Sequence, residues 1–527
     1  MKIFANLANS VADLLARLRE GRRNEPIGKA RRRILVVGGG PVGLAFATSL
    51  HELVGHSVDI TVADGRWVRQ GGRVRWRDVA EGVYRREQVV TIQTLVSDRL
   101  PASVRSAMFP SGGYCEIWPT GRESPRELGF PRNVRIRELE DRLLELAHAQ
   151  GLRLLAKRID PAQLEVSAWD LIVIADGANS IVRDHFVRAF GRADATAYSL
   201  RDQQIVDTVL GVRIRSLMSS PSSVVMTIAQ QRYLLNAREG DGLLYIRLTD
   251  QEAAEVRGRV EGEYEFRPCI QSNPCQVTWR ADRGHKTFIC SRRNSVFVPA
   301  NDPQSFLWPR VLQGLRLFDI PESSIESITT FPLSMARRGA FTAELSPTGS
   351  ERAIFGALIG DAAGVTHFWP GRGLNRGLSS AYALAVVLSR VDSTAVLRSA
   401  DLAEFEGIMA QLQSRHQDRA WRAMVQKRGQ MVLPVKSVIA DAISGPRPSR
   451  ESMILTMRER IETLSAGLEG RLPQPADQRE LFAALERVDD ETLAVICTTG
   501  PWETRQSGGP EIDVQGMLRV RQGADAD

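Results

Sequence analysis

The chain has 527 residues and a mass of 58.4 kDa, which at roughly 150 residues per domain allows about three domains. Hydrophobic residues make up 43% and charged residues 25%, so the composition is globular and excludes collagen-like, low-complexity and largely disordered chains. The 69 basic and 62 acidic residues leave a net charge of +7, which is mild for this length and does not indicate nucleic acid as a partner.

Cysteine usage and hydropathy indicate a cytoplasmic protein. Five cysteines are too few for a disulfide framework, and the close pair Cys269 and Cys275 lacks the spacing of a zinc or redox motif. We therefore expect reduced thiols and no metal site. No apolar run reaches the roughly 18 residues of a membrane span.

An amphipathic stretch opens the sequence. Apolar residues at helical spacing between residues 3 and 18 predict a helix, with arginines clustered at its end (Arg17, Arg19, Arg22 and Arg23). Either this helix docks on the body of the protein, or it lies on a membrane surface or a partner protein. A polar linker completes residues 1–30, and the globular body begins at Arg31.

A glycine loop follows the first strand of the body. The apolar run 34–37 predicts a buried strand, and the loop after it carries G-x-G-x-x-G at the start of a predicted helix. The first glycine permits a tight turn, the second lets a pyrophosphate approach the backbone, and the third lets helix and strand pack. The loop residues are Gly38, Gly40, Pro41, Val42 and Gly43. Asp64 ends the next predicted strand, where a carboxylate binds the ribose hydroxyls of an adenosine. These features predict a dinucleotide site.

Apolar periodicity predicts an α/β protein with a discontinuous Rossmann-like domain. Buried strands are expected at 169–175 and 354–359, and period-two segments between them include a hairpin through residues 239–242. The expected units are a Rossmann-like domain of residues 31–195 and 350–395, an inserted sheet-rich domain of residues 196–349, a helical region of residues 396–505 and a flexible tail of residues 506–527.

Residues 66–86 are rich in arginine and show no regular period, so we expect them to be irregular. The arginines are Arg66, Arg69, Arg73, Arg75 and Arg77. Such a run is usually a solvated surface. Alternatively, it receives the 2′-phosphate of NADPH or an acidic substrate.

Two further segments follow buried strands. Residues 176–183 read D-G-A-N-S-I-V-R, and Gly360-Asp361 precedes G-R-G-L-N-R-G at 371–377. Together with the glycine loop, and in this order, they resemble the three signatures of the class A flavoprotein monooxygenases, which include the aromatic hydroxylases. The resemblance covers roughly residues 33–390. It implies that the Rossmann-like domain binds FAD and that the inserted domain covers the substrate.

The resemblance also implies a set of cofactor contacts. The glycine loop would hold the pyrophosphate, Asp64 the adenosine ribose and Asp361 the ribityl chain. Asp176 and Gly177 match a motif that contacts FAD and is linked to NAD(P)H use. The remaining matches are two arginines near the cofactor, the glycine before Asp361, and backbone that runs under the flavin ring: Arg86, Arg137, Gly360, Gly371, Gly373, Leu374 and Asn375.

The chain departs from the family pattern between its last two motifs. Gly364 stands where many relatives have His, and Phe368 where many have Pro. The segment 367–371, H-F-W-P-G, is similar instead to the MICAL-type monooxygenases, although no extension of the actin-directed kind accompanies it. The candidate catalytic residues are His367, Phe368 and Trp369. His367 either orients this loop or assists proton transfer.

Residues of the inserted domain are expected to face the flavin. The candidates for the substrate pocket are Tyr233, Tyr245, Phe331 and Leu333. For each tyrosine the alternative is a half-buried strand residue without contact to substrate.

The resemblance implies a monooxygenase reaction. NAD(P)H reduces FAD, O2 adds as a flavin C4a-hydroperoxide, and a small organic substrate, aromatic or polyketide-like, is hydroxylated or epoxidised. No second glycine fingerprint for NAD(P)H occurs, and the flavin-halogenase motif W-x-W-x-I-P is missing. Two alternatives stay open: a flavin-dependent reductase or dehydrogenase without oxygen insertion, and a protein- or carrier-directed oxidase that docks through its terminal helices.

Overall fold

The computed structural model describes residues 31–501 and 511–520, with gaps at 79, 84, 117–128, 216–219, 239, 257–258, 262–263, 267–276, 283–284, 291–306, 348, 351, 368–372, 469–471 and 473. The predicted N-terminal helix falls outside these residues. Among the helices described, none combines the length and the hydropathy needed to span a membrane.

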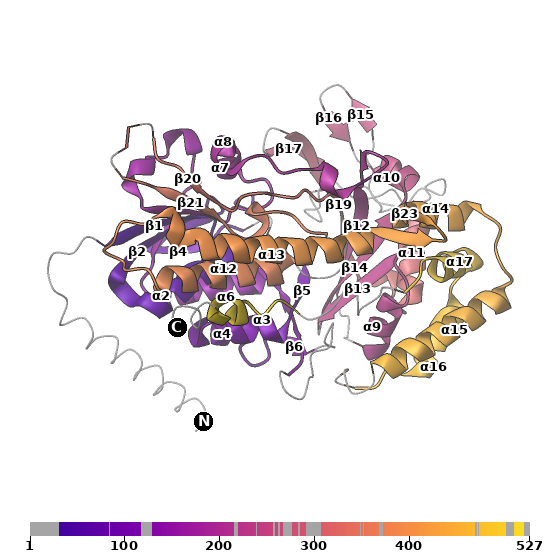
Figure 1. Ribbon diagram of the computed structural model, residues 1–527. Helices are drawn as coiled ribbons and strands as arrows, with labels where there is room; N and C mark the ends of the chain where they lie inside the picture. Colours follow the sequence, from indigo (N-terminus) through magenta and orange to yellow (C-terminus); the bar gives the residue numbers. More distant parts are fainter. Residues whose placement is uncertain are drawn as a thin grey trace.

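A mainly parallel sheet forms the first half of the described fold (Figure 1). Its order is β20-β21-β9-β1-β2-β8, and only β20 runs antiparallel to its neighbour. The bounds are β1 Arg32–Val37, β2 Val58–Ala63, β8 Arg153–Leu155, β9 Leu171–Ile174, β20 Thr342–Glu344 and β21 Phe355–Leu358. The inner strands are apolar at nearly every position because both faces of the sheet are buried.

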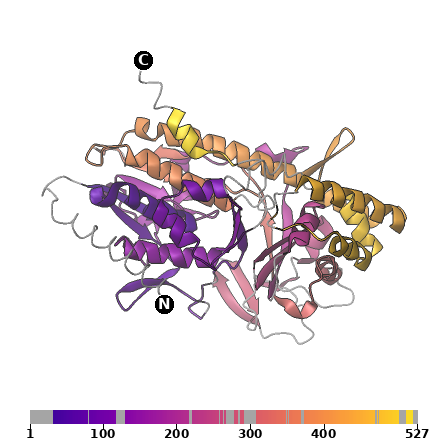
Figure 2. The ribbon, with the colours of Figure 1, turned by 90° about the horizontal axis from the view of Figure 1, so that it is seen from below.

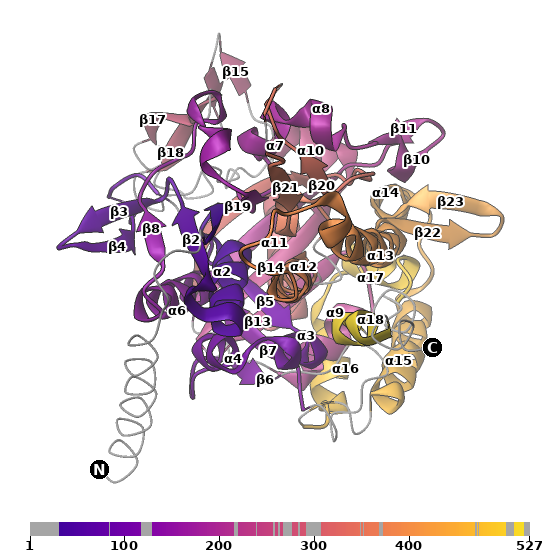
Figure 3. The ribbon, with the colours of Figure 1, turned by 60° about the vertical axis from the view of Figure 1, so that its left-hand side comes forward.

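Helices α2 (Pro41–Val54), α6 (Ile136–Ala149) and α12 (Gly373–Ser389) pack beside one another along this sheet (Figure 3). Leu44, Ala47 and Leu50 of α2 are fully buried, as the helical spacing of the sequence predicts. The long helix α13 (Ser399–Met424) runs alongside α12 and reaches the second half of the molecule (Figure 1). It therefore ties the two halves together.

An antiparallel sheet forms the second half, with the order β13-β14-β12-β19. The bounds are β12 Asp207–Arg215, β13 Tyr233–Arg238, β14 Asp241–Leu248 and β19 Ile325–Leu333. The expected hairpin is present as β13 and β14. One face packs on α9 (Pro221–Ile228) and α11 (Leu307–Leu317), and α15 (Arg450–Gly467), α16 (Gln478–Arg487) and α17 (Asp490–Thr498) extend the same apolar core behind these two helices, as Figure 2 shows at the end opposite the parallel sheet.

A small sheet lies between the two halves. Its strands are β5 (Val89–Ile92), β6 (Cys115–Glu116) and β7 (Arg132–Arg135), and β5 and β7 contact the antiparallel sheet. Across this boundary the Asn133 side-chain amide donates to the Ala237 carbonyl at 2.8 Å. The α/β fold with an inserted antiparallel sheet and a helical C-terminal region is confirmed, whereas the domain boundaries stay a prediction.

The arginine-rich stretch is regular, contrary to our expectation. Strands β3 (Trp67–Gln70) and β4 (Arg73–Trp76) form a two-stranded hairpin. The turn is Gly71-Gly72, and both residues have positive φ, which is the geometry that glycine permits in tight hairpins. Several of its arginines form ion pairs at the surface, including Arg73 with Glu145 and Arg75 with Glu81.

Two elements near the C-terminus add to the expected helices. A second hairpin, β22 (Val425–Arg428) and β23 (Met431–Pro434), projects from the end of α13 (Figure 3). Helix α18 (Val514–Val520) lies within the segment predicted to be a flexible tail. Val514 and Leu518 are buried there, and α18 packs on α12 and α13.

Candidate functional site

The predicted dinucleotide motifs converge at one edge of the parallel sheet. The glycine loop, Asp64, Asp176 and Gly360 directly follow the carboxyl ends of β1, β2, β9 and β21 or lie within two residues of them. We call this the carboxyl edge. In open parallel sheets, ligands bind outside the carboxyl ends of the strands.

The glycine loop is packed too tightly for side chains at three of its positions, and a Cβ at one of them, Gly39, would lie 2.0 Å from the Trp67 ring. A Cβ at Gly38, whose φ is +104°, would lie 2.6 Å from the backbone of Ala175, and a Cβ at Gly43 would lie 2.0 Å from the Gly38 carbonyl oxygen. A Cβ at Gly40 would meet only the Arg66 guanidinium, at 3.5 Å. The loop is therefore closed toward the sheet and open near Gly40. Pro41 and Val42 begin α2 there, with the amide groups of its first turn.

Asp64 organises the loop from the next strand. Its carboxylate accepts the Gly39 N–H at 2.8 Å and the Arg66 N–H at 2.7 Å. The Arg66 guanidinium also donates to both oxygens, from Nε at 3.0 Å and from Nη2 at 2.7 Å. These four hydrogen bonds hold Asp64 in one orientation beside the loop, where a ribose is expected.

A buried glutamate near Asp64 forms ion pairs with two arginines. Glu140 of α6 pairs with Arg66 and Arg85, each at 3.3 Å. Both guanidinium groups lie 4.7 Å from the ring centroid of Trp76. Burial raises the pKa of Glu140, whereas the neighbouring arginines act in the opposite direction. Sequence reasoning missed this cluster, because the hairpin that delivers Trp76 was not predicted.

Asp176 lies at the end of β9 with an incompletely bonded carboxylate. Its Oδ1 atom is buried and has no hydrogen-bond partner among the described residues. Burial raises its pKa, and Ser180 and Arg183 offset this in part. Gly177 beside it has a φ of +94°, and a Cβ there would lie 3.9 Å from the Arg86 guanidinium. An orphaned acceptor, an open glycine and an adjacent arginine fit a group that carries hydroxyls and phosphates.

Gly360 and Asp361 lie in the turn after β21, next to α2. Gly360 has a φ of +61°, and a Cβ there would lie 3.2 Å from Val42. The buried Arg376 guanidinium donates to the Gly360 carbonyl at 3.0 Å and also to the Gly364 carbonyl. Burial lowers the pKa of Arg376, and the charge of Asp361 partly restores it. Arg376 therefore fixes the chain around Asp361.

The first turn of α12 is held by Asn375. Its side chain accepts the Gln93 N–H and donates to the Thr91 carbonyl, both at 2.7 Å, so it joins α12 to β5. Gly373 and Leu374 begin the same helix. Arg137, at the start of α6, is half exposed and pairs with Glu87 at 2.8 Å. Phe368, Trp369 and Gly371 lie outside the described residues.

His367 is buried between the carboxyl edge and the antiparallel sheet. Its Nε2 lies 3.0 Å from Asp207 Oδ2, and Arg247 Nε lies 3.2 Å from the same oxygen. Burial lowers the pKa of His367 although Asp207 acts to raise it. The sequence analysis identified His367 as a candidate but neither Asp207 nor Arg247, because these two residues lie in strands that carry no motif.

The two candidate tyrosines occupy opposite faces of the antiparallel sheet. Tyr245 and Arg247 are two residues apart in β14 and so share the face that meets His367. Tyr233 pairs with Ile246, which places it on the other face, where its hydroxyl donates to Gln313 of α11 at 3.3 Å. Leu333 pairs with Asp207 and is partly exposed. Phe331 pairs with Val209, and its side chain is not among those described.

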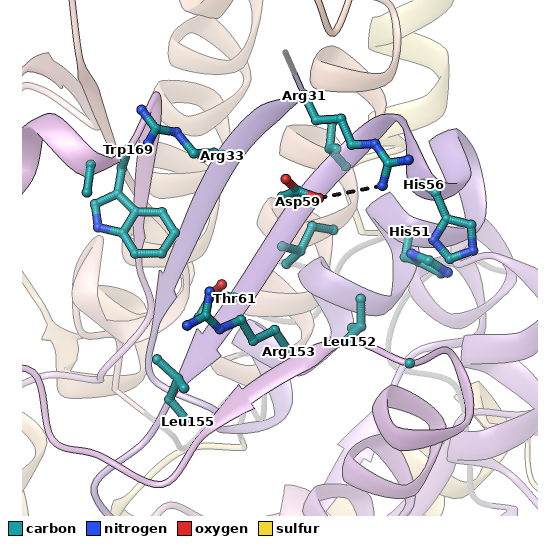
Figure 4. Close-up of a pocket in the computed structure, with 14 residues that line it drawn as sticks. Arg31, Arg33, His51, His56, Asp59, Thr61, Leu152, Arg153, Leu155 and Trp169 are labelled. Carbon is teal, nitrogen blue, oxygen red and sulfur yellow. Dashed lines mark ion pairs between the residues drawn. The ribbon is translucent and has the colours of Figure 1, made fainter. Parts of the chain in front are cut away.

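A hollow of about 530 Å³ lies at the opposite edge of the parallel sheet, around the amino ends of β1, β2 and β8 (Figure 4). Polar side chains line it, including Arg31, which pairs with Asp59 at 3.8 Å, and Arg153. No motif residue lines this hollow, so we do not assign the dinucleotide to it. In the described part of the chain, no cluster of His, Cys, Asp and Glu suits a metal ion.

Comparison with known proteins gives one curated relative. The 3-hydroxy-4-methyl-anthranilyl-[aryl-carrier protein] 5-monooxygenase of Streptosporangium sibiricum is 33% identical over 161 residues. The match covers 30% of this chain and 42% of that protein, so it spans less than half of the relative's length. It supports the resemblance to the flavoprotein monooxygenases at the level of the family. No family model matches the chain.

Solved structures of flavin enzymes are similar at low identity. A p-nitrophenol 4-monooxygenase from Pseudomonas putida DLL-E4 is 13% identical with a TM-score of 0.46, over 89% of this chain and 99% of that one. A flavin-dependent halogenase is 12% identical with a TM-score of 0.48, over 87% and 77%.

Proposed function

We propose that the chain is an FAD-dependent monooxygenase that consumes NAD(P)H and acts on a small aromatic substrate. The observation that carries the proposal is the convergence of three separate motifs, around Gly40, Asp176 and Asp361, at the carboxyl edge beside a second sheet. A single glycine loop is compatible with many dinucleotides. Three motifs in this order, together with the curated relative, favour a flavin.

Individual residues have distinct roles in this proposal. The first turn of α2 and Arg86 bind the pyrophosphate, Asp64 binds the adenosine ribose, and Asp361 binds the ribityl chain. The orphaned Oδ1 of Asp176 accepts a hydroxyl hydrogen of the cofactor, which removes the cost of burying it without a partner. FAD, when bound, supplies hydride acceptance and oxygen activation.

The antiparallel sheet covers the reacting side and excludes water. The face that carries Tyr245 is buried against the rest of the molecule, since Tyr245 is 4% exposed. Its neighbours Leu234 and Leu243 are buried as well. An apolar cover of this kind keeps an activated oxygen species away from solvent protons. The substrate would lie between this face and the carboxyl edge.

The curated relative suggests a more specific substrate. By its name it acts on an aryl group attached to an aryl-carrier protein. We therefore propose an aryl group carried as a thioester as the second, narrower candidate. It agrees with the carrier-directed alternative that the terminal helices raise.

The decisive experiment combines a spectrum with oxygen labelling. Purified protein is titrated with FAD, and NADH or NADPH oxidation is followed in air with an aryl acid, its pantetheine thioester and its carrier-bound form. Mass spectrometry under isotopic O2 then reports whether one oxygen atom enters the product. Product that forms equally well without O2 would replace the monooxygenase with the reductase alternative. Protein that takes up no FAD would overturn the proposal.

A further inference from the structure

Three ionisable side chains from distant parts of the chain form one buried group. His367 precedes α12, Asp207 opens β12, and Arg247 lies near the end of β14. Their exposed fractions are 1%, 0% and 0%. Asp207 Oδ2 lies within 3.0 Å of His367 Nε2 and 3.2 Å of Arg247 Nε. Because buried charges are costly unless paired, this arrangement needs an explanation beyond packing.

The charges of the group determine its hydrogen bonding. Burial acts to raise the pKa of Asp207, but Arg247, His367 and Lys436 together hold it below its ordinary value. The carboxylate is therefore ionised and accepts hydrogen bonds. Burial lowers the pKa of His367, which keeps its imidazole neutral. Nε2 must then carry the proton that it shares with Asp207, and this fixes both the tautomer and the ring plane.

The group also joins three structural units. His367 belongs to the segment that runs from Asp361 at the carboxyl edge to α12. Asp207 and Arg247 lie on the same face of the antiparallel sheet as Tyr245. Arg247 Nη2 donates to the Ala423 carbonyl of α13 at 2.7 Å. The carboxylate of Asp207 is thus one point at which the cofactor side and the substrate side of the site are bonded together.

We propose that Asp207 is a positioning residue that, through His367, fixes the distance between the cofactor side and the substrate face of the antiparallel sheet. This inference rests on the proposed function. In the coupled reaction, NAD(P)H, O2, a proton and the substrate give NAD(P)+, water and oxygenated product. If the substrate face is displaced, the same two electrons and the O2 leave with protons as H2O2. Asp207 therefore controls the ratio of product to NAD(P)H consumed.

The test compares Asp207→Asn, His367→Gln and the double variant in FAD-loaded protein. FAD affinity is measured by titration, and product, H2O2 and NAD(P)H are measured in the same reaction. We expect FAD affinity within about threefold of the parent and a product-to-NAD(P)H ratio at least fivefold lower in each single variant. The product-to-NAD(P)H ratio of the double variant should be no lower than that of the worse single variant, because the two residues act as one unit. If Asp207→Asn does not fold, His367→Gln carries the same test.

A matched control separates positioning from loss of stability. Glu252→Gln disrupts another buried carboxylate–arginine pair of the same domain, Glu252 with Arg232 at 2.8 Å, without touching His367. It should lower the melting temperature and leave the ratio of product to NAD(P)H unchanged. Additive losses in the double variant, an unchanged ratio in both single variants, or an equal loss in Glu252→Gln would each overturn the positioning role. A parent protein that does not oxidise NAD(P)H with O2 would overturn the proposed function, and this inference with it.

Discussion

The backbone N–H of Gly39 donates to the side chain of Asp64 at 2.8 Å, so the glycine loop and the end of the next strand form one unit. The same carboxylate holds the Arg66 guanidinium. A change at Asp64 therefore acts on the loop, on the arginine and on the expected ribose contact together.

We expect Asp64→Ala to weaken FAD binding by about 10- to 100-fold, because hydrogen bonds to charged groups contribute about 1.5–3 kcal/mol each. A fluorescence titration of FAD measures this. Asp59→Ala is the control: Asp59 lies in β2, the strand that Asp64 follows, but it is exposed and pairs with Arg31 at the opposite edge. Equal losses of affinity in the two variants would contradict the assignment of the carboxyl edge.

Two glycines of the loop should respond differently to alanine. Gly43→Ala places a Cβ 2.0 Å from a backbone oxygen. We therefore expect a loss of about 1–3 kcal/mol in the free energy of unfolding, seen as a lower melting temperature, and also weaker FAD binding. At Gly40 the φ is −69° and the nearest atom is 3.5 Å away, so alanine is compatible with the fold. Gly40→Ala should keep the melting temperature and lose FAD affinity. Calorimetry and titration on the same samples distinguish the two effects.

The tyrosine pair tests which face of the antiparallel sheet meets the substrate. We expect Tyr245→Phe to change KM or kcat because Tyr245 lies on the face that meets His367. Tyr233→Phe should leave the kinetics unaltered and cost about 1 kcal/mol of stability, since its hydroxyl bonds Gln313. Steady-state kinetics and urea unfolding of both variants measure this. Kinetic effects confined to Tyr233→Phe would reverse the orientation of the sheet that we infer.

Acid stability should depend on Glu252. Burial acts to raise its pKa, but Arg232, Arg310 and the Thr249 N–H lower it to about 2. A depressed folded pKa stabilises the protein above the unfolded value of roughly 4.3, and this is lost as the pH falls toward 2. The shift corresponds to about 3 kcal/mol. Glu252→Gln should therefore be less stable than the parent at pH 7, and its free energy of unfolding should fall less steeply as the pH is lowered. Urea unfolding between pH 2 and 7 measures both effects. If the free energy of unfolding of the variant fell as steeply with pH as that of the parent, this role of Glu252 in acid stability would be excluded.

The parallel sheet could be predicted because its strands are short apolar runs followed by glycine and aspartate, a pattern with few alternatives. The β3–β4 hairpin was missed because its arginines masked the alternation, although Gly71-Gly72 is a strong turn signal. Likewise, the role of Glu140 could not be foreseen. The ion pairs of a buried glutamate depend on which arginines the tertiary fold places beside it.

The face of the antiparallel sheet that each tyrosine occupies depends on the register between β13 and β14. Tyr233 opposes Ile246 and not Tyr245, because the turn before Asp241 fixes the pairing of the two strands. A turn one residue longer would have placed both rings on one face. Periodicity within each strand predicts which residues alternate, but the face that meets the site depends on the turn and on the units that pack against the sheet. The same reason applies to Asp207 and Arg247.

The antiparallel sheet is covered in two layers: α9 and α11 contact its strands, and α15 and α16 from the last part of the chain pack on these two helices, with α17 against α15. Residues 207–333 supply the sheet and the inner helices, whereas α15, α16 and α17 between residues 450 and 498 supply the outer apolar layer. During synthesis the sheet and its inner helices therefore leave the ribosome well before the outer layer. At about 5–20 residues per second, the outer apolar surface of α9 and α11 stays uncovered for some ten seconds or more. The chain should depend on chaperones in that interval, and fragments that end before α15 should aggregate.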